Sequence, residues 1–131
     1  MIYIDCYLVP VPRANRAAYE ELARISAQVV KEHGALRVVE CWLDASGPDA
    51  ASYHGAEARL ESAAYGSFAT AAGAGEDETV VLAYVEWPDK ATRDAGMEKV
   101  TSDSRMQFDH LPPTFDGRRL IAAGFTPMLD E

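Results

Sequence analysis

Three carboxylate residues fall in segments whose alternation of apolar and polar side chains predicts β-strands: Asp5, Glu40 and Glu86. Neighbouring strands of a sheet lie about 4.8 Å apart, so carboxylates on adjacent strands repel one another when they share a face. Such repulsion raises the pKa of the least solvated carboxyl toward neutral pH, where it can act as a general acid or base. We therefore take Asp5, Glu40 and Glu86 as candidate catalytic residues for proton transfer.

Aromatic residues occupy positions of the same parity on these strands. Tyr7, Trp42 and Tyr84 are expected on the same side as the three carboxylates, where they can form the walls of a small-molecule site. Arg118, which follows a turn sequence, can hold an acidic ligand, and it completes the set of candidate ligand-binding residues. The alternative is that the carboxylates pair with arginines such as Arg118, or that they reach solvent.

Metal and thiol chemistry have little support in the sequence. His33, His54 and His110 are far apart, and no His-x-x-x-His or Cys-x-x-Cys spacing occurs, so we expect no metal site and no tightly held cofactor. Cys6 and Cys41 are expected on strands separated by a third strand, about 9 to 10 Å apart, too far for a disulfide. They are interpreted as small buried residues on the side that the helices cover.

The elements that position these residues alternate in a recognisable order. Apolar periodicity, prolines, glycines and helix-capping residues predict four strands and two helices. The strands are expected at 2–9, 35–43, 78–87 and 118–126, and the helices at 15–33 and 89–100. This β-α-β-β-α-β order predicts a ferredoxin-like α+β fold with a four-stranded antiparallel sheet, in which strand four lies beside one, one beside three, and three beside two.

The whole chain, residues 1–131, is expected to form one such domain, with an insertion at about 44–77. That segment is rich in alanine, glycine and serine and has no sustained strand period. A connection of this length without structure is uncommon in a compact domain. We expect it to be partly helical, with a short helix over 56–65, or else mobile.

Two helices cover only one side of a four-stranded sheet. The wholly apolar side is expected beneath them, and consists of Ile2, Ile4, Cys6, Leu8, Val39, Cys41, Val81, Ala83 and Val85. The opposite side mixes aromatics with carboxylates and is too apolar to remain in water. It consists of Tyr3, Asp5, Tyr7, Val38, Glu40, Trp42, Leu82, Tyr84 and Glu86. We therefore expect a homodimer through this sheet face; the alternative is a monomer whose insertion folds over it.

Composition narrows the range of partners. The net charge of −9 and pI near 4.7 argue against nucleic acid and anionic membrane surfaces, which require clustered lysine and arginine. The longest apolar runs fall short of the roughly 18 residues of a membrane span. Met1 leads directly into strand-like sequence, with neither the basic start nor the cleavage site of an export signal, so a cytoplasmic location is expected.

Several short motifs, taken in order, give the chain a resemblance to a known family. They are Tyr3-Ile4-Asp5, Val9-Pro10-Val11-Pro12 with Tyr19, His33-Gly34-Ala35, Glu40-Cys41-Trp42, Glu86-Trp87-Pro88 with Lys90, Arg93 and Asp94, Phe115-Asp116-Gly117-Arg118-Arg119, and Gly124-Phe125. In these the chain resembles the YbaA-like family of small bacterial proteins of unknown function. It departs from the family pattern at Cys6, Ala123 and 103–105, and its 44–77 segment is longer than the family's usual linker.

The resemblance implies a dimeric α/β barrel, a superfamily that includes cofactor-independent monooxygenases, lactone isomerases and haem-handling proteins. Fold does not by itself specify function. The leading hypothesis is a small-molecule-binding dimeric barrel, an enzyme of monooxygenase or isomerase type that needs no cofactor. The alternative is a non-enzymatic homodimeric interaction or stress-related module. A haem-binding relative is a third class, with no histidine placed in a predicted pocket.

Overall fold

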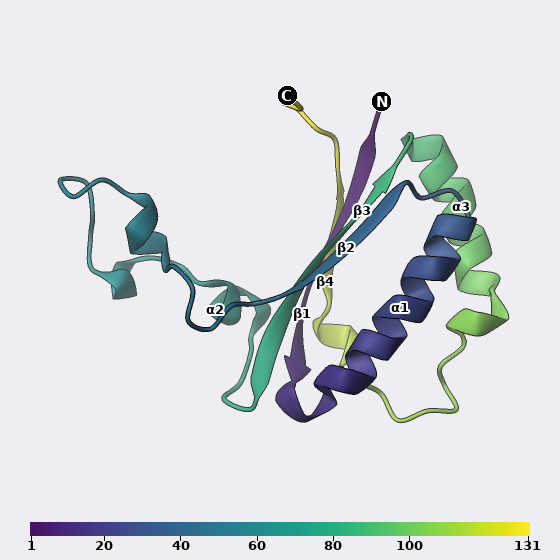
Figure 1. Cartoon of the computed structure of the whole chain (residues 1–131), viewed down its shortest axis with the longest axis horizontal. Coiled ribbons are helices and arrows are strands. Elements are labelled where there is room, and N and C mark those ends of the chain that lie inside the picture. Colours follow the sequence, from purple (N-terminus) through teal and green to yellow (C-terminus); the bar gives the residue numbers. More distant parts are fainter.

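The computed structural model describes residues 1–131 and shows an α+β fold (Figure 1). Four strands and two long helices follow the predicted order, with an additional short helix, α2, before the third strand. The elements are β1 (Tyr3–Pro12), α1 (Arg16–Glu32), β2 (Arg37–Trp42), α2 (Phe68–Ala72), β3 (Glu78–Trp87), α3 (Lys90–Ser102) and β4 (Ile121–Phe125). None of these helices combines the length and the apolar character that crossing a membrane requires.

The four strands form one antiparallel sheet in the order β2-β3-β1-β4, which confirms the predicted topology. Both long helices lie on one side of this sheet (Figure 1). We call that side the helix face; it carries Tyr3, Asp5, Tyr7, Val9, Val38, Glu40, Trp42, Val81, Ala83, Val85 and Trp87. The other side is the open face, and it carries Ile4, Cys6, Leu8, Arg37, Val39, Cys41, Leu82, Tyr84, Glu86, Ile121, Ala123 and Phe125.

The predicted assignment of the two faces is therefore correct for β3 and wrong for β1 and β2. Asp5, Tyr7, Glu40 and Trp42 lie beneath the helices, whereas the apolar alternate positions of β1 face away from them. The physical reason is that residues of the helix layer supply hydrogen-bond partners on this side of the sheet, namely Tyr19 for Glu40, Glu20 for Trp42 and Arg93 for Asp5. Glu86 remains on the open face, so the three carboxylates do not share one side of the sheet.

Trp87 is the centre of the larger hydrophobic cluster and has no exposed surface. The third strand delivers it to the point where α1 ends and α3 passes. A Cβ atom on Gly96 of α3 would lie 2.5 Å from the His33 carbonyl oxygen and 2.7 Å from the Trp87 ring. The glycine thus allows α3 to approach the tryptophan closely, and this contact seats α3 on the sheet.

The first strand continues through Pro10 and Pro12, beyond the end predicted at residue 9. The amide of Arg13, one residue after Pro12, donates to the Asp77 carbonyl across from it. Because successive amides of a strand point to opposite sides, the two proline nitrogens point away from β3. On that side β4 pairs only as far as Leu8, so no hydrogen bond is lost.

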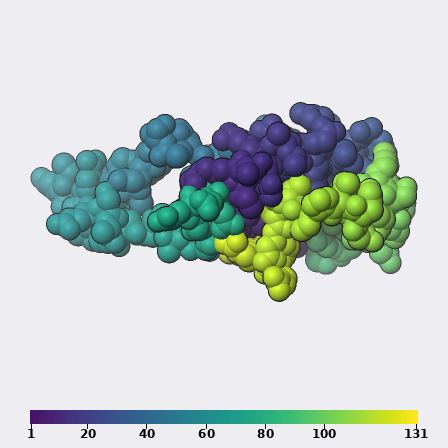
Figure 2. All heavy atoms as spheres, turned by 90° about the horizontal axis from the view of Figure 1, so that it is seen from below, coloured from purple at the N-terminus to yellow at the C-terminus, as the bar shows by residue number.

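The segment between β2 and β3 contains an arm, residues 44–67, that projects from the open-face side of the sheet (Figures 1 and 2). It is held together by its own contacts: Asp49 accepts hydrogen bonds from Ser52 and Ser62, and the His54 ring stacks on Tyr65 at 4.8 Å. The helix predicted over 56–65 is wrong. The arm has only short 3-10 turns, and α2 begins after it, capped by Ser67.

Candidate functional site

A groove of about 380 Å³ lies between α1 and the edge strand β2. Its walls are mainly the apolar side chains of both elements, and its polar groups come from Glu20 and Arg24 of α1 and Glu40 of β2. Ligand sites typically enclose about 300 to 1,000 Å³ of mostly apolar surface with a few polar groups that fix orientation. Glu40 and Trp42, two of the predicted site residues, meet here.

Tyr19 and Glu40 form the most closely paired polar contact in this groove. The Tyr19 hydroxyl donates to Glu40 Oε1 at 2.5 Å. Burial, followed by this hydrogen bond and the carboxylate charge, raises the pKa of Tyr19 far above its ordinary value. Tyr19 therefore stays protonated and donates, while Glu40, on an edge strand and exposed to solvent, keeps its second oxygen for another partner.

Trp42 is fixed from two directions. Its indole N–H donates to Glu20 Oε1 at 2.8 Å, and its ring meets Tyr19 edge-on at 5.4 Å between centroids. The guanidinium of Arg16 lies over the Trp42 ring, 4.7 Å from its centroid, in cation–π geometry. The Trp42 ring thus forms an aromatic wall of the groove, and its face already binds the guanidinium of Arg16.

Asp5 belongs to a different cluster, where one oxygen of its carboxylate accepts two hydrogen bonds. It is 4% exposed, and Oδ2 accepts from Trp87 Nε1 at 3.1 Å and from Arg93 Nε at 3.0 Å. Arg93 also reaches Asp94 at 3.1 Å, and Lys90 pairs with Asp94 at 2.7 Å. Asp5 therefore forms an ion pair, as in the alternative interpretation, but its partner is Arg93 of α3 instead of Arg118.

Tyr7 packs against both hydrophobic clusters of the helix face, the one that contains Trp87 and the one that contains Val9. Burial and the neighbouring Asp5 charge raise its pKa to about 12. Its neighbours across the ladder are the small residues Ala83 and Ala122. The ring accordingly fills space above them as a neutral phenol, which favours a packing role over that of a ligand contact.

The remaining predicted site residues lie apart from the groove. Glu86 and Tyr84 are on the open face, where Glu86 is opposite Ile4 and Arg37, and Tyr84 is opposite Cys6 and Val39. Arg118 stands in a turn before β4, with its side chain 91% exposed, and pairs with Asp116 two residues away at 3.1 Å. The seven predicted residues thus divide among the groove, the core and two separate surfaces.

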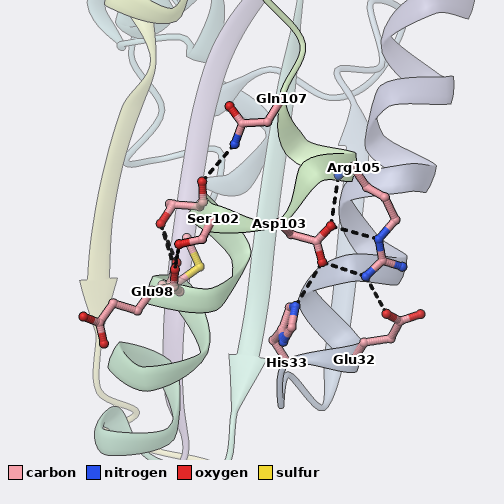
Figure 3. A network of polar contacts seen from close by, with 9 residues as sticks. Glu32, His33, Glu98, Ser102, Asp103, Arg105 and Gln107 are labelled. Atoms are coloured by element: carbon pink, nitrogen blue, oxygen red, sulfur yellow. Dashed lines mark hydrogen bonds and ion pairs between the residues drawn. The ribbon is translucent and has the colours of Figure 1, made fainter.

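A second polar network ties the end of α1 to the turn after α3 (Figure 3). Asp103 accepts from Arg105 at 2.7 and 3.0 Å and lies 3.2 Å from His33 Nε2, while Arg105 also binds Glu32 at 2.6 Å. These contacts, the Arg105 guanidinium first, hold the pKa of the Asp103 carboxyl well below its usual range. The network joins two helices, and its neighbouring hollow is broad and open.

Sequence reasoning missed the α1 side of the groove, namely Arg16, Tyr19 and Glu20. The spacing of the apolar residues Ala18, Leu22, Ile25 and Val29 predicts a buried stripe along this helix. In the structure, however, Ala18 is exposed and Tyr19 is buried. A tyrosine beside an apolar stripe was the available signal, since a buried hydroxyl needs a partner. No group of three or more histidine, cysteine, aspartate or glutamate side chains is arranged to hold a metal ion.

Comparison with known proteins adds three findings. The model of a family described as protein of unknown function, DUF1428, matches residues 2–117. The proteins named "Uncharacterized protein YbaA" of Escherichia coli K12 and of Shigella flexneri are each 39% identical to the chain, over the full length of both sequences. A crystal structure titled as a dimeric ferredoxin-like protein from an uncultured marine organism superposes over 100% of both chains, with a TM-score of 0.56 and 9% identity. This last likeness concerns the fold.

Asp5 and Glu86 should respond differently to loss of charge. Asp5→Asn leaves the Arg93 guanidinium with the exposed Asp94 as its only carboxylate partner. It should lower the free energy of unfolding by about 2 kcal/mol, less than the 3–5 kcal/mol of fully buried pairs because Arg93 is partly exposed. Glu86→Gln, on the open face, is the matched control and should stay within about 0.5 kcal/mol of the parent. Urea denaturation measures both; equal effects would contradict the assignment of faces.

The Asp103 network should make stability depend on acid pH. Because the folded-state pKa of Asp103 lies below its ordinary value near 4, its contribution is present above that pH and is lost as the pH falls below it. Asp103→Asn should therefore lose less stability than the parent between pH 5 and pH 2.5, measured by urea denaturation. Asp130→Asn, near the exposed C-terminus, is the control. Parallel curves for the parent and Asp103→Asn would refute the role given to the network.

Proposed function

The chain belongs to the DUF1428 family of YbaA-like proteins, and we propose that it is a homodimer that binds a small molecule in the groove between α1 and β2 of each protomer. The observation that carries the ligand site is the Tyr19–Glu40 pair, which presents a carboxylate oxygen and an aromatic wall to one open groove. The homodimer rests on a separate observation, the apolar character of the open face.

The open face presents a continuous set of large apolar side chains. Leu82, Ile121 and Phe125 are exposed, and Ile4, Leu8 and Val39 flank them on the paired strands. Monomeric proteins seldom leave a contiguous apolar patch of several hundred Å² in water. A second sheet packed on this side would remove it from solvent, and the ferredoxin-like structure with a similar fold is described as dimeric.

The groove favours a ligand with an apolar or aromatic body and a hydrogen-bond donor. The carboxylates of Glu20 and Glu40 accept hydrogen bonds, and the Trp42 ring offers a stacking surface now covered by Arg16. A phenol, an aromatic amine or the enol form of a ketone meets these requirements.

The chemistry that such a pair can perform is proton transfer. Glu40 takes a proton from a carbon or hydroxyl of the bound molecule, with its other oxygen held by Tyr19. Because Glu40 is exposed, this proton exchanges with water, and Glu40 then returns one proton to a second atom of the molecule. The net change is an isomerisation that requires no oxidant. The geometry supports this reaction because Glu40 supplies a base that the Tyr19 hydroxyl holds in place. In a purely non-enzymatic dimer, the same residues would only attach α1 to β2.

The open-face dimer has a direct test. Leu82→Glu places a carboxylate in the middle of the proposed interface while leaving the helix face untouched. The dissociation constant of the dimer should rise at least about tenfold, because a buried unpaired charge costs well over 1.4 kcal/mol. Light scattering on the parent should give twice the chain mass of 14.3 kDa, and on the variant a single chain. The control is Ala18→Glu, a substitution at an exposed position of α1, which should leave the dimer intact. A monomeric parent protein would refute the dimer.

The ligand site is tested by thermal shift with a panel of phenols, aromatic amines and enolisable ketones. A compound that binds the folded protein raises its melting temperature, and we expect the shift to disappear in Glu40→Gln and Tyr19→Phe but to persist in Glu86→Gln. Exchange of deuterium from solvent into a bound ketone, followed by mass spectrometry, then detects proton transfer. Equal shifts in the parent and in Glu40→Gln would exclude this groove. Binding without exchange would favour the non-enzymatic alternative.

A further inference from the structure

The arm, residues 44–67, buries only one of its residues, Ala51, in the monomer. It leaves the end of β2 on the open-face side and stands off the body, as Figure 2 shows. Two of its large side chains are mostly in solvent: Tyr53 is 77% exposed and Leu60 is 61% exposed. Yet its hydrogen bonds give it a defined shape, including Leu60 N–H to the Tyr65 hydroxyl at 2.9 Å.

We infer that the arm clasps a second copy of the chain and covers the partner's β4. The inference rests on the proposed homodimer. Since the arm projects on the side where the second sheet would lie, a protomer docked on the open face must lie beside it (Figure 1). The arm then forms the rim of the interface, continuous with the apolar sheet contact.

The edge strand β4 is exposed to solvent in the monomer. All five residues of β4 are exposed, on both of its faces, and it pairs only with β1. An exposed apolar edge strand is a site for unwanted association unless another segment protects it. The exposed side chain of Ile121, at the start of β4, can receive the arm's Tyr53 and Leu60.

Symmetry brings these two segments together. When the twofold axis runs parallel to the strands, β2 of one protomer lies over β4 of the other, because the sheet order is reversed across the interface. The ladder directions place the end of β2 and the start of β4 at the same end of the sheet. The arm therefore emerges beside the partner's turn Gly117–Arg119, from which β4 begins.

The charges of the two segments are complementary. The arm carries four carboxylates, Asp44, Asp49, Glu57 and Glu61, against one arginine, Arg59, a net charge of −3. The turn before β4, residues 116–119, carries Arg118 and Arg119 against Asp116, a net charge of +1. The Arg118 side chain is 91% exposed while it pairs with Asp116. Opposite charges at the rim of an interface steer association and fix its register.

A photoreactive residue at position 53 locates the arm. Tyr53 is replaced by p-benzoylphenylalanine, and the full-length variant is prepared with natural and with heavy nitrogen isotopes, mixed and irradiated. We expect crosslinks between light and heavy chains that end within residues 117–125. Crosslinks confined to one chain, or to the partner's α1, would overturn the clasp even if the protein is dimeric. A monomeric protein would overturn the homodimer as well.

Charge reversal gives an independent measure on the dimer. Glu57→Lys combined with Glu61→Lys, and separately Arg118→Glu, should each weaken dimerisation about threefold, as expected for exposed ion pairs. The combination of all three in one chain should restore the affinity, since each protomer then presents reversed charges to the other. Lys31→Glu, in the last turn of α1, is the control. Additive weakening in the combined variant would contradict the contact between the arm and Arg118.

Discussion

The hydrogen bonds from Trp87 and Arg93 to the buried Asp5 carboxylate determine much of this fold. They join β1, β3 and α3, and they allow an aspartate to sit beneath the helices instead of facing water. With Asp5 turned inward, strand alternation turns Ile4, Cys6 and Leu8 outward. A single buried and hydrogen-bonded carboxylate thereby decides which side of the sheet is left apolar and uncovered.

The order of elements and the pairing of strands were predictable from the sequence, whereas the orientation of two strands was not. Alternation along β1 and β2 separates two sets of side chains but does not tell which set faces the helices. The rule that the more apolar set lies inside failed here because Asp5 finds its partners at positions 87 and 93, far along the chain. For β3 the more apolar set does lie beneath the helices, and Val81, Ala83 and Val85 were placed correctly.

The candidate site shows the same division. Glu40 and Trp42 were chosen for chemistry and alternate spacing, and they do share the groove. Their helical partners escaped notice because the phase of α1 was set by Ala18, whereas the structure buries Tyr19, whose ring packs on Trp42 and Phe115. Local periodicity fixes a helix to within about one residue, and one residue turns a side chain by about 100°. That uncertainty is enough to hide one wall of a site.

The long connection between β2 and β3 has a consequence for how the family can diversify. Trp42 and Val81 pair in the ladder although the whole arm and α2 separate them in the chain. Loop-closure entropy grows only with the logarithm of loop length, so this connection costs about 2 kcal/mol more than a four-residue hairpin turn. Lengthening or shortening the connection by a few residues would change the free energy of folding by only a few tenths of a kcal/mol. The β2–β3 ladder fixes where the connection begins and ends, and its length can vary among family members at little cost in stability.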